Sequence, residues 1–198
     1  MIIFRKVKWK NLLSTGNYWT EIQLDCKDST LVVGENGSGK STMLDALCFA
    51  LFNKPFRKVS KPQLINSING RDLIVELYFD TNNKSYKVVR GAKPNVFEIY
   101  CNGELVNQDA NARDYQEYLE KFILKLNYKS FTQIVILGSA SFTPFMQLSA
   151  NDRRSIIEEL LEIRVFSTMN GLLKSKMTEN KDEITEKKHS IELNEPFI

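Results

Sequence analysis

Eight consecutive residues match the phosphate-binding loop pattern G-x-x-x-x-G-K-[ST]: Gly34, Glu35, Asn36, Gly37, Ser38, Gly39, Lys40 and Ser41. With Thr42, which follows directly, they form a loop of nine residues. The β-branched, apolar run 30–33 precedes the loop and predicts a buried strand. The run 42–52 follows it, contains no Gly or Pro and is apolar nearly all round, which predicts a buried helix. A strand, a glycine loop and a helix in this order predict an α/β fold, that of a P-loop NTPase.

Each part of this loop suits a nucleotide. Its glycines allow φ values that side chains disfavour, so that successive N–H groups point inward, and the helix start adds unpaired donors and a positive dipole end. Lys40 is placed to stabilise the charge of the β- and γ-phosphates, the Ser41 hydroxyl to ligate Mg²⁺, and Thr42 to lie near the α-phosphate. We therefore expect all nine loop residues to bind ATP. The alternative, a glycine-rich turn before a core helix, is disfavoured by the flanking pattern and the extra glycines.

Composition excludes several classes of function. The three cysteines, Cys26, Cys48 and Cys101, are far apart, which argues against a local zinc or redox motif and favours buried thiols in a reducing compartment. The only histidine, His189, lies in a charged stretch, so histidine-based catalysis is not expected. The N-terminus becomes charged too early for a signal peptide, and no apolar run is long enough to span a membrane. We expect a cytoplasmic protein, in the host-cell cytoplasm if it is viral, without a membrane partner.

The remaining patterns are periodic. Alternation predicts strands at 2–9 and 18–24, and three antiparallel strands, a β meander, at 73–79, 85–90 and 96–101, with a tight turn at Asn102-Gly103. Helical spacing predicts a helix over 113–126, a β-branched run predicts a buried strand at 131–137, and an N-cap at 149–152 predicts another helix. The basic, proline-bounded stretch 54–62 is a surface loop, either a solvated turn or a segment that faces phosphate or DNA.

The C-terminal stretch has a different character. Heptad spacing links Leu173, Met177, Asn180, Ile184, Lys187 and Ile191, with charges of both signs between them. This pattern predicts the root of a long coiled-coil helix whose partner is not in the chain. We expect an ATPase lobe over 1–163, the start of the coiled coil over 164–193, and an irregular or truncated tail over 194–198.

The predicted nucleotide site is half of a hydrolytic site. ATP hydrolysis also needs a carboxylate after a buried strand to position Mg²⁺, and a base or water-positioning residue beside it. The nearest candidates, Asp72, Glu76 and Asp80, lie in an alternating antiparallel pattern instead. We therefore expect the general base to lie outside this chain, which leaves ATPase activity of the chain alone undecided.

Several further segments carry a family resemblance. They are 54–57, 63–67, 93–99, 143–146, 153–154 and 158–162, together with the phosphate loop and the glycine-free helix after it. In this combination the chain resembles the ABC-type ATPase heads of the SMC/SbcC class, the ATPase subunits of DNA double-strand-break repair nuclease complexes, including those of tailed phages. The resemblance implies an N-terminal head half, completed by a C-terminal half that carries the catalytic carboxylates. It also implies a homodimer of heads that closes over ATP, a partner nuclease and double-stranded DNA.

The resemblance also implies weaker site candidates: Ser14, Asn66, Ser67 and Gln133. Family members often have an Arg after the first strand, where this chain has Leu13 beside Ser14. The family's γ-phosphate-sensing Gln would fall near Ser139, and Gln133 lies earlier in that segment.

Three other classes of protein also contain a phosphate loop of this kind. A membrane-transporter ATPase subunit would carry its signature within this length and lack the long helix. A small P-loop kinase or GTPase would need a substrate- or base-reading motif, and a nucleotide-binding scaffold fragment would need none.

Overall fold

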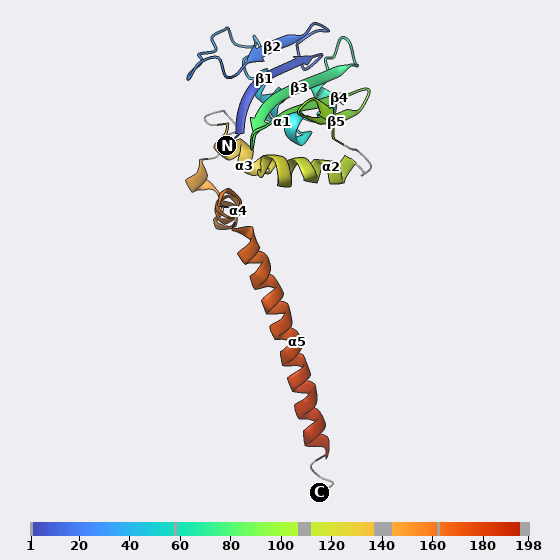
Figure 1. Ribbon diagram of the computed structural model, residues 1–198, viewed down its shortest axis with the longest axis vertical. Helices are drawn as coiled ribbons and strands as arrows, with labels where there is room; N and C mark the ends of the chain where they lie inside the picture. The colour runs from blue at the N-terminus through green and yellow to red at the C-terminus, as the bar shows by residue number, and fades with distance from the viewer. Residues whose placement is uncertain (1, 58, 107–111, 137–143, 162, 195–198) are drawn as a thin grey trace. The chain divides into compact units, whose positions relative to one another are not determined.

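The computed structural model describes residues 2–57, 59–106, 112–136, 144–161 and 163–194 (Figure 1). The chain forms two compact units, Met1–Leu148 and Ser149–Ile198.

The first unit is built on a six-stranded antiparallel sheet with the strand order β2-β1-β3-β4-β5-β6. The strands are β1 (Ile2–Lys10), β2 (Thr20–Gln23), β3 (Leu73–Thr81), β4 (Lys84–Ala92), β5 (Val96–Cys101) and β6 (Glu104–Leu105). The predicted meander is confirmed as β3, β4 and β5. The predicted turn at Asn102-Gly103 joins β5 to β6, with φ values of 52° and 89° that suit Asn and Gly.

One face of the sheet is buried and the other is polar. Alternate residues of β3 are buried, from Leu73 to Phe79, whereas Glu76 and Tyr78 point to the polar face. Helix α1 (Thr42–Phe52) packs against the buried face across β1, β3 and β4 (Figure 1). Nearly every residue of α1 is buried, which confirms the prediction of a buried helix.

Shorter helices complete this unit: η1 (Lys61–Leu64), α2 (Ala112–Tyr118), the π-helical turn η2 (Leu119–Leu124), α3 (Tyr128–Ile134) and η3 (Phe145–Gln147). The helix predicted over 113–126 is therefore confirmed as α2 and η2. Phe131 of α3 packs between aromatic rings of the first strand and of α1, with ring centroids 6.1 Å from Phe4 and 5.2 Å from Phe52.

The prediction of a buried strand at 131–137 is wrong for its described part. Residues 131–134 are helical, because the Asn127 side chain caps α3 by accepting from the Ser130 N–H at 2.9 Å. Residue 137 lies outside the described residues. Packing of Phe131 into the aromatic cluster outweighs the β-propensity of its neighbours.

The prediction of a buried strand at 30–33 is also wrong. These residues form no strand, and the side chains of Leu31 and Val33 are 86% and 80% exposed. A strand needs a neighbouring strand for its backbone hydrogen bonds, and none of the described strands pairs with this segment.

The prediction that the three thiols are buried is correct for Cys48 alone. Burial raises the pKa of the Cys48 thiol to about 12. Cys26 is exposed and Cys101 is half-buried.

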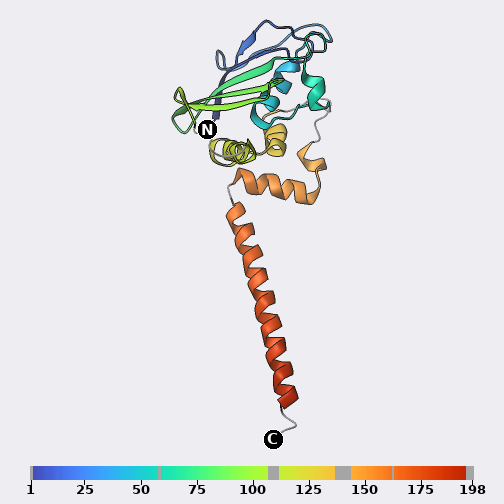
Figure 2. The ribbon, with the colours of Figure 1, turned by 90° about the vertical axis from the view of Figure 1, so that its right-hand side faces the viewer.

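The second unit contains α4 (Ala150–Leu160) and α5 (Arg164–Asn194). The Ser149 hydroxyl caps α4 by accepting from the Asp152 N–H at 3.2 Å, as the N-cap pattern predicted. Figure 2 shows α5 as one continuous helix. Its heptad residues Leu173, Met177, Ile184 and Ile191 are 55–64% exposed. Among the described residues, no helix has the length and apolarity that crossing a membrane requires.

Candidate nucleotide-binding site

The glycine loop between residue 34 and α1 has the backbone that its sequence predicts. Gly37 and Gly39 have φ values of 88° and 93°, which side chains rarely adopt. At Gly34 a Cβ would lie 2.7 Å from Ser38 Oγ, so a side chain there would require the Ser38 hydroxyl to rotate away. The loop then enters α1, where the Thr42 N–H donates to the Gly39 carbonyl at 2.9 Å.

Lys40 reaches back across this loop. Its Nζ donates to the carbonyl oxygens of Gly34 and Glu35, each at 2.6 Å. An ammonium group has three N–H donors, so one donor remains. The lysine thus stabilises the curled loop and at the same time holds a positive charge at its mouth.

The start of α1 supplies the next polar groups. Ser41 occupies the N-cap position, yet its side chain makes no capping hydrogen bond and the residue is exposed. Its hydroxyl is therefore available to a ligand. Thr42, predicted to lie near the α-phosphate, lines the same cavity but is only 2% exposed.

These groups face a cavity of about 370 Å³. Its walls are Leu13, Ser14, Asn36, Gly37, Gly39, Lys40, Ser41, Thr42 and Arg57. Six of the nine predicted loop residues line this cavity, together with Ser14 from the weaker candidates. The loop residues Gly34, Glu35 and Ser38 are not part of the wall.

Arg57 is the site residue that sequence reasoning did not single out, although the basic stretch 54–62 contains it. Its Nε lies 2.6 Å from Oδ2 of Asp45, a fully buried carboxylate of α1. The other carboxylate oxygen of Asp45 accepts from the N–H groups of Phe56 and Arg57, each at 3.1 Å. Asp45 therefore fixes both the backbone and the guanidinium of this segment against α1. The sequence signal that could have indicated Arg57 is Asp45, an acidic residue in the first turn of an otherwise apolar helix, which needs a cation beside it.

Asn66 fixes the part of the cavity wall that Leu13 and Ser14 form. Its Nδ2 donates to the carbonyls of Leu13 and Thr15 at 3.0 and 3.1 Å, and its Oδ1 accepts from the N–H groups of Ile68 and Asn69. These bonds use both halves of the amide, so the structure gives Asn66 the task of shaping the turn that carries Ser14. Leu13 itself has a φ of 54°, a conformation that such a set of bonds holds in place.

The other weak candidates lie elsewhere. Ser67 is exposed and does not line the cavity. Gln133 lies in α3, where its Oε1 is buried and makes no hydrogen bond within the described part of the chain. Ser139 lies outside the described residues. Within the described ranges, no three His, Cys, Asp or Glu side chains gather as a metal cluster.

The geometry of this cavity suits a polyphosphate. Two cations, Lys40 and Arg57, stand at a helix N-terminus whose N–H groups point outward. A sequence profile of the AAA domain matches residues 6–195. The chain belongs to the AAA domain family. Membership of this ATPase family implies that the domain binds nucleotide, in agreement with the cavity.

Two curated proteins are similar in sequence to this AAA domain. Exonuclease subunit 2 of Enterobacteria phage T4 is 49% identical over 170 residues, which cover 86% of the chain and 30% of the relative. The DNA double-strand break repair Rad50 ATPase of Thermoplasma volcanium is 25% identical over 166 residues, which cover 82% of the chain and 18% of the relative. The AAA domain thus spans less than a third of the length of these relatives.

A solved structure supports the fold. An SMC ATPase, studied for its ATP-driven dimerization and DNA-stimulated activation, superposes with a TM-score of 0.53 at 21% identity. The match covers 80% of this chain and 99% of the solved one. The predicted fold, a P-loop head lobe of the SMC/SbcC class with a β meander and a long helix, is confirmed.

Proposed function

We propose that this AAA domain is the ATP-binding half of a DNA repair and recombination ATPase. In this proposal the domain joins a C-terminal half to form a head, and two heads close over ATP and gate a partner nuclease at double-strand ends of DNA. The observation that carries the proposal is the cavity that places Lys40 and Arg57 together at the start of α1. The 49% identity to a phage exonuclease subunit supports the DNA-directed part.

Within the site, each residue has a proposed task. The loop N–H groups and Lys40 hold the β- and γ-phosphates, and Arg57 adds a second positive charge to the phosphate chain. The exposed, uncapped hydroxyl of Ser41 would serve as a ligand of Mg²⁺, which would supply positive charge to the phosphate chain. Hydrolysis needs carboxylates that we assign to the C-terminal half.

Two exposed apolar surfaces support the proposal that the domain pairs with a C-terminal half. The segment 30–33 leads directly into the phosphate loop, and its apolar side chains Leu31 and Val33 are exposed. An extended apolar segment of this kind is a template for pairing with a further strand. Along α5, the apolar heptad residues are likewise exposed, as in one strand of a coiled coil whose second strand is missing.

The first experiment measures binding. Lys40→Met should abolish Mg-ATP binding, or weaken it severely, while the circular dichroism of the chain stays unchanged. Lys84→Met, which removes an exposed lysine on the β3–β4 hairpin, is the matched control. Binding of Mg-ATP by Lys40→Met with the affinity of the parent chain would show that the site assignment is wrong. In Ser41→Ala, ATP affinity should lose most of its dependence on Mg²⁺.

The second experiment tests whether ATP turnover requires the C-terminal head half. We expect ATP turnover only after a C-terminal head half and the partner nuclease are added, and a further rise with DNA. Leu31→Glu should prevent this turnover while ATP binding persists, because a charge cannot enter an apolar strand interface. Ile68→Glu, at a side chain that is 90% exposed, is the control. Robust turnover by the chain alone would favour a self-sufficient P-loop enzyme instead.

A further inference from the structure

Arg90 is a buried cation that has no carboxylate partner among the residues that the structure describes. It lies on β4 and is 4% exposed. Its Nε donates to the Ala50 carbonyl at 2.8 Å, its Nη2 donates to Gln116 Oε1 at 2.6 Å, and its Cζ lies 3.6 Å from the ring centre of Phe97. Both hydrogen-bond acceptors are neutral. A guanidinium has five N–H groups, so three of them make no hydrogen bond within the described part of the chain.

This arrangement is costly without a counter-charge. A buried ion is stable only when hydrogen bonds and opposite charge replace its water. The carbonyl end of α1 supplies only partial negative charge. Burial lowers the pKa of the Arg90 guanidinium, and the Glu120 carboxylate opposes this shift from a distance. Burial and, after it, the charge of Arg90 lower the pKa of Lys61.

Gln116 holds the guanidinium in one orientation. Its Nε2 donates to the Leu51 carbonyl at 2.8 Å and to Glu120 Oε1 at 2.7 Å. These two bonds fix which end of the amide faces Arg90. The guanidinium is therefore pre-organised, as a rigid anion receptor requires.

Arg90 faces a cavity of about 370 Å³ that is separate from the phosphate loop. Lys54 and Arg113 line it with Arg90. Among the described lining residues the one carboxylate is that of Glu117, which pairs with Lys121 at 2.9 Å. The wall also contains Asn53, whose Oδ1 is buried and has no hydrogen-bond partner among the described residues. The cavity lies at the C-terminal end of α1, about 16 Å along the helix from the phosphate loop.

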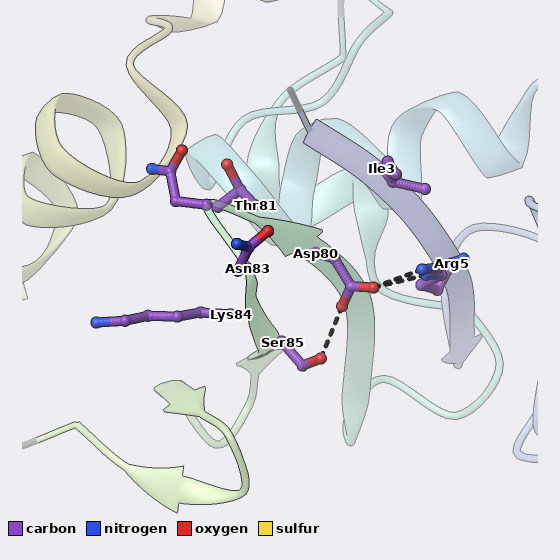
Figure 3. A pocket seen from close by; sticks show the side chains of 8 residues that line it. Ile3, Arg5, Asp80, Thr81, Asn83, Lys84 and Ser85 are labelled. Carbon is purple, nitrogen blue, oxygen red and sulfur yellow. Dashed lines mark hydrogen bonds and ion pairs between the residues drawn. The ribbon is translucent and has the colours of Figure 1, made fainter.

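A third cavity shows the contrast. It measures about 550 Å³ and lies beside the β3–β4 hairpin (Figure 3). Its arginine, Arg5, bonds to Asp80 at 2.7–2.8 Å and to Asp25 at 2.9 Å. Asp80 also accepts from the Ser85 hydroxyl at 2.8 Å. Arg5 is therefore paired with two carboxylates, whereas Arg90 bonds only to neutral acceptors within the described part of the chain.

We propose that the Arg90 cavity is a second anion site, which binds the phosphate or carboxylate group of a small ligand independently of the phosphate loop. An oxyanion entering the cavity would accept from the unused N–H groups of Arg90, in the paired geometry that a guanidinium offers to planar or tetrahedral oxyanions. Lys54 and Arg113 would add charge at the rim.

The test uses backbone amide NMR of the whole chain, because it separates the two sites. Inorganic phosphate and succinate are each titrated at constant ionic strength. The amides of Asn53, Asn95 and Phe97 report on the Arg90 cavity, and those of Gly39 and Lys40 report on the phosphate loop. A shift of the first set with either anion identifies the site, and the two titrations tell phosphate ligands from carboxylate ligands.

Variants decide whether the cavity causes the shifts. Lys54→Gln with Arg113→Gln should weaken the response of the first set by at least about tenfold, because both remove charge-assisted contacts. Lys27→Gln with Arg71→Gln makes the same change of charge at exposed positions and should have no such effect. Lys40→Met should also leave the first set responsive, so the outcome does not depend on the phosphate loop. An absent response to both anions, or one that survives in the rim variant, would overturn the proposal. Arg90→Lys is a further variant if it folds.

Discussion

Asp45 and Arg57 form an ion pair, 2.6 Å between Oδ2 and Nε, that joins the buried side of α1 to the wall of the phosphate-loop cavity. The carboxylate is fully buried, whereas the Arg57 side chain is 42% exposed. A single helix thus carries the phosphate-binding N-terminus and the anchor that positions a second cation beside it. Stability and nucleotide binding are coupled through this pair.

Asp45→Ala should lower the free energy of unfolding by about 2–4 kcal/mol, because it leaves the N–H groups of Phe56 and Arg57 without their acceptor and breaks a partly buried ion pair. Urea unfolding measures this change. Asp28→Ala, at an exposed aspartate, is the control and should change stability by less than about 0.5 kcal/mol. Equal stability of the two variants would contradict the anchoring role.

Arg57→Ala should weaken ATP binding by about tenfold or more, since a charge-assisted contact to phosphate is lost. Titration with a fluorescent ATP analogue, at a temperature where the variant is folded, measures the affinity. Arg71→Ala is the matched control, because its side chain is 79% exposed and its ion pair is a long one, 3.5 Å, to its neighbour Asp72. An unchanged affinity in Arg57→Ala would remove Arg57 from the nucleotide site.

Asn66→Ala should cost about 1–3 kcal/mol of stability and weaken ATP binding, because the turn that carries Ser14 loses two hydrogen bonds and the N–H groups of Ile68 and Asn69 lose their acceptor. Ser67→Ala, at the exposed neighbouring residue, should change neither quantity. Thermal unfolding and ATP titration of the two variants separate a positioning residue from a bystander. Similar losses in both would assign the effect to the segment as a whole.

Asp80 makes stability depend on pH. Hydrogen bonds from Ser85 and Arg5 lower the pKa of Asp80 below its ordinary value. A lowered carboxyl pKa stabilises the fold above the unfolded-state pKa of about 3.9, and this contribution disappears as the pH falls through the lower folded-state pKa. Asp80→Asn should therefore reduce Tm at pH 7, and the difference from wild type should shrink below about pH 4. A difference that stays constant down to strong acid would exclude this linkage.

Local patterns were sufficient for much of the molecule. The glycine loop, the buried helix after it, the meander and the long C-terminal helix each follow from a period or a motif within a few residues. Alternation in β3 predicts its buried side chains because each residue of a strand faces the opposite side from the last. The Asn102-Gly103 turn follows from the φ values that only such residues adopt readily.

The tertiary structure decided what local patterns cannot contain. The run 30–33 has the composition of a buried strand. A strand is buried only beside a neighbouring strand, and none of the described strands pairs with this run. Residues 131–134 have the propensity of a strand, but an N-cap at Asn127 and the aromatic cluster around Phe131 make them helical. Arg57 and Arg90 are two arginines in the sequence. Folding distinguishes their chemistry: it places Arg57 against Asp45, and it buries Arg90 against neutral acceptors among the described residues.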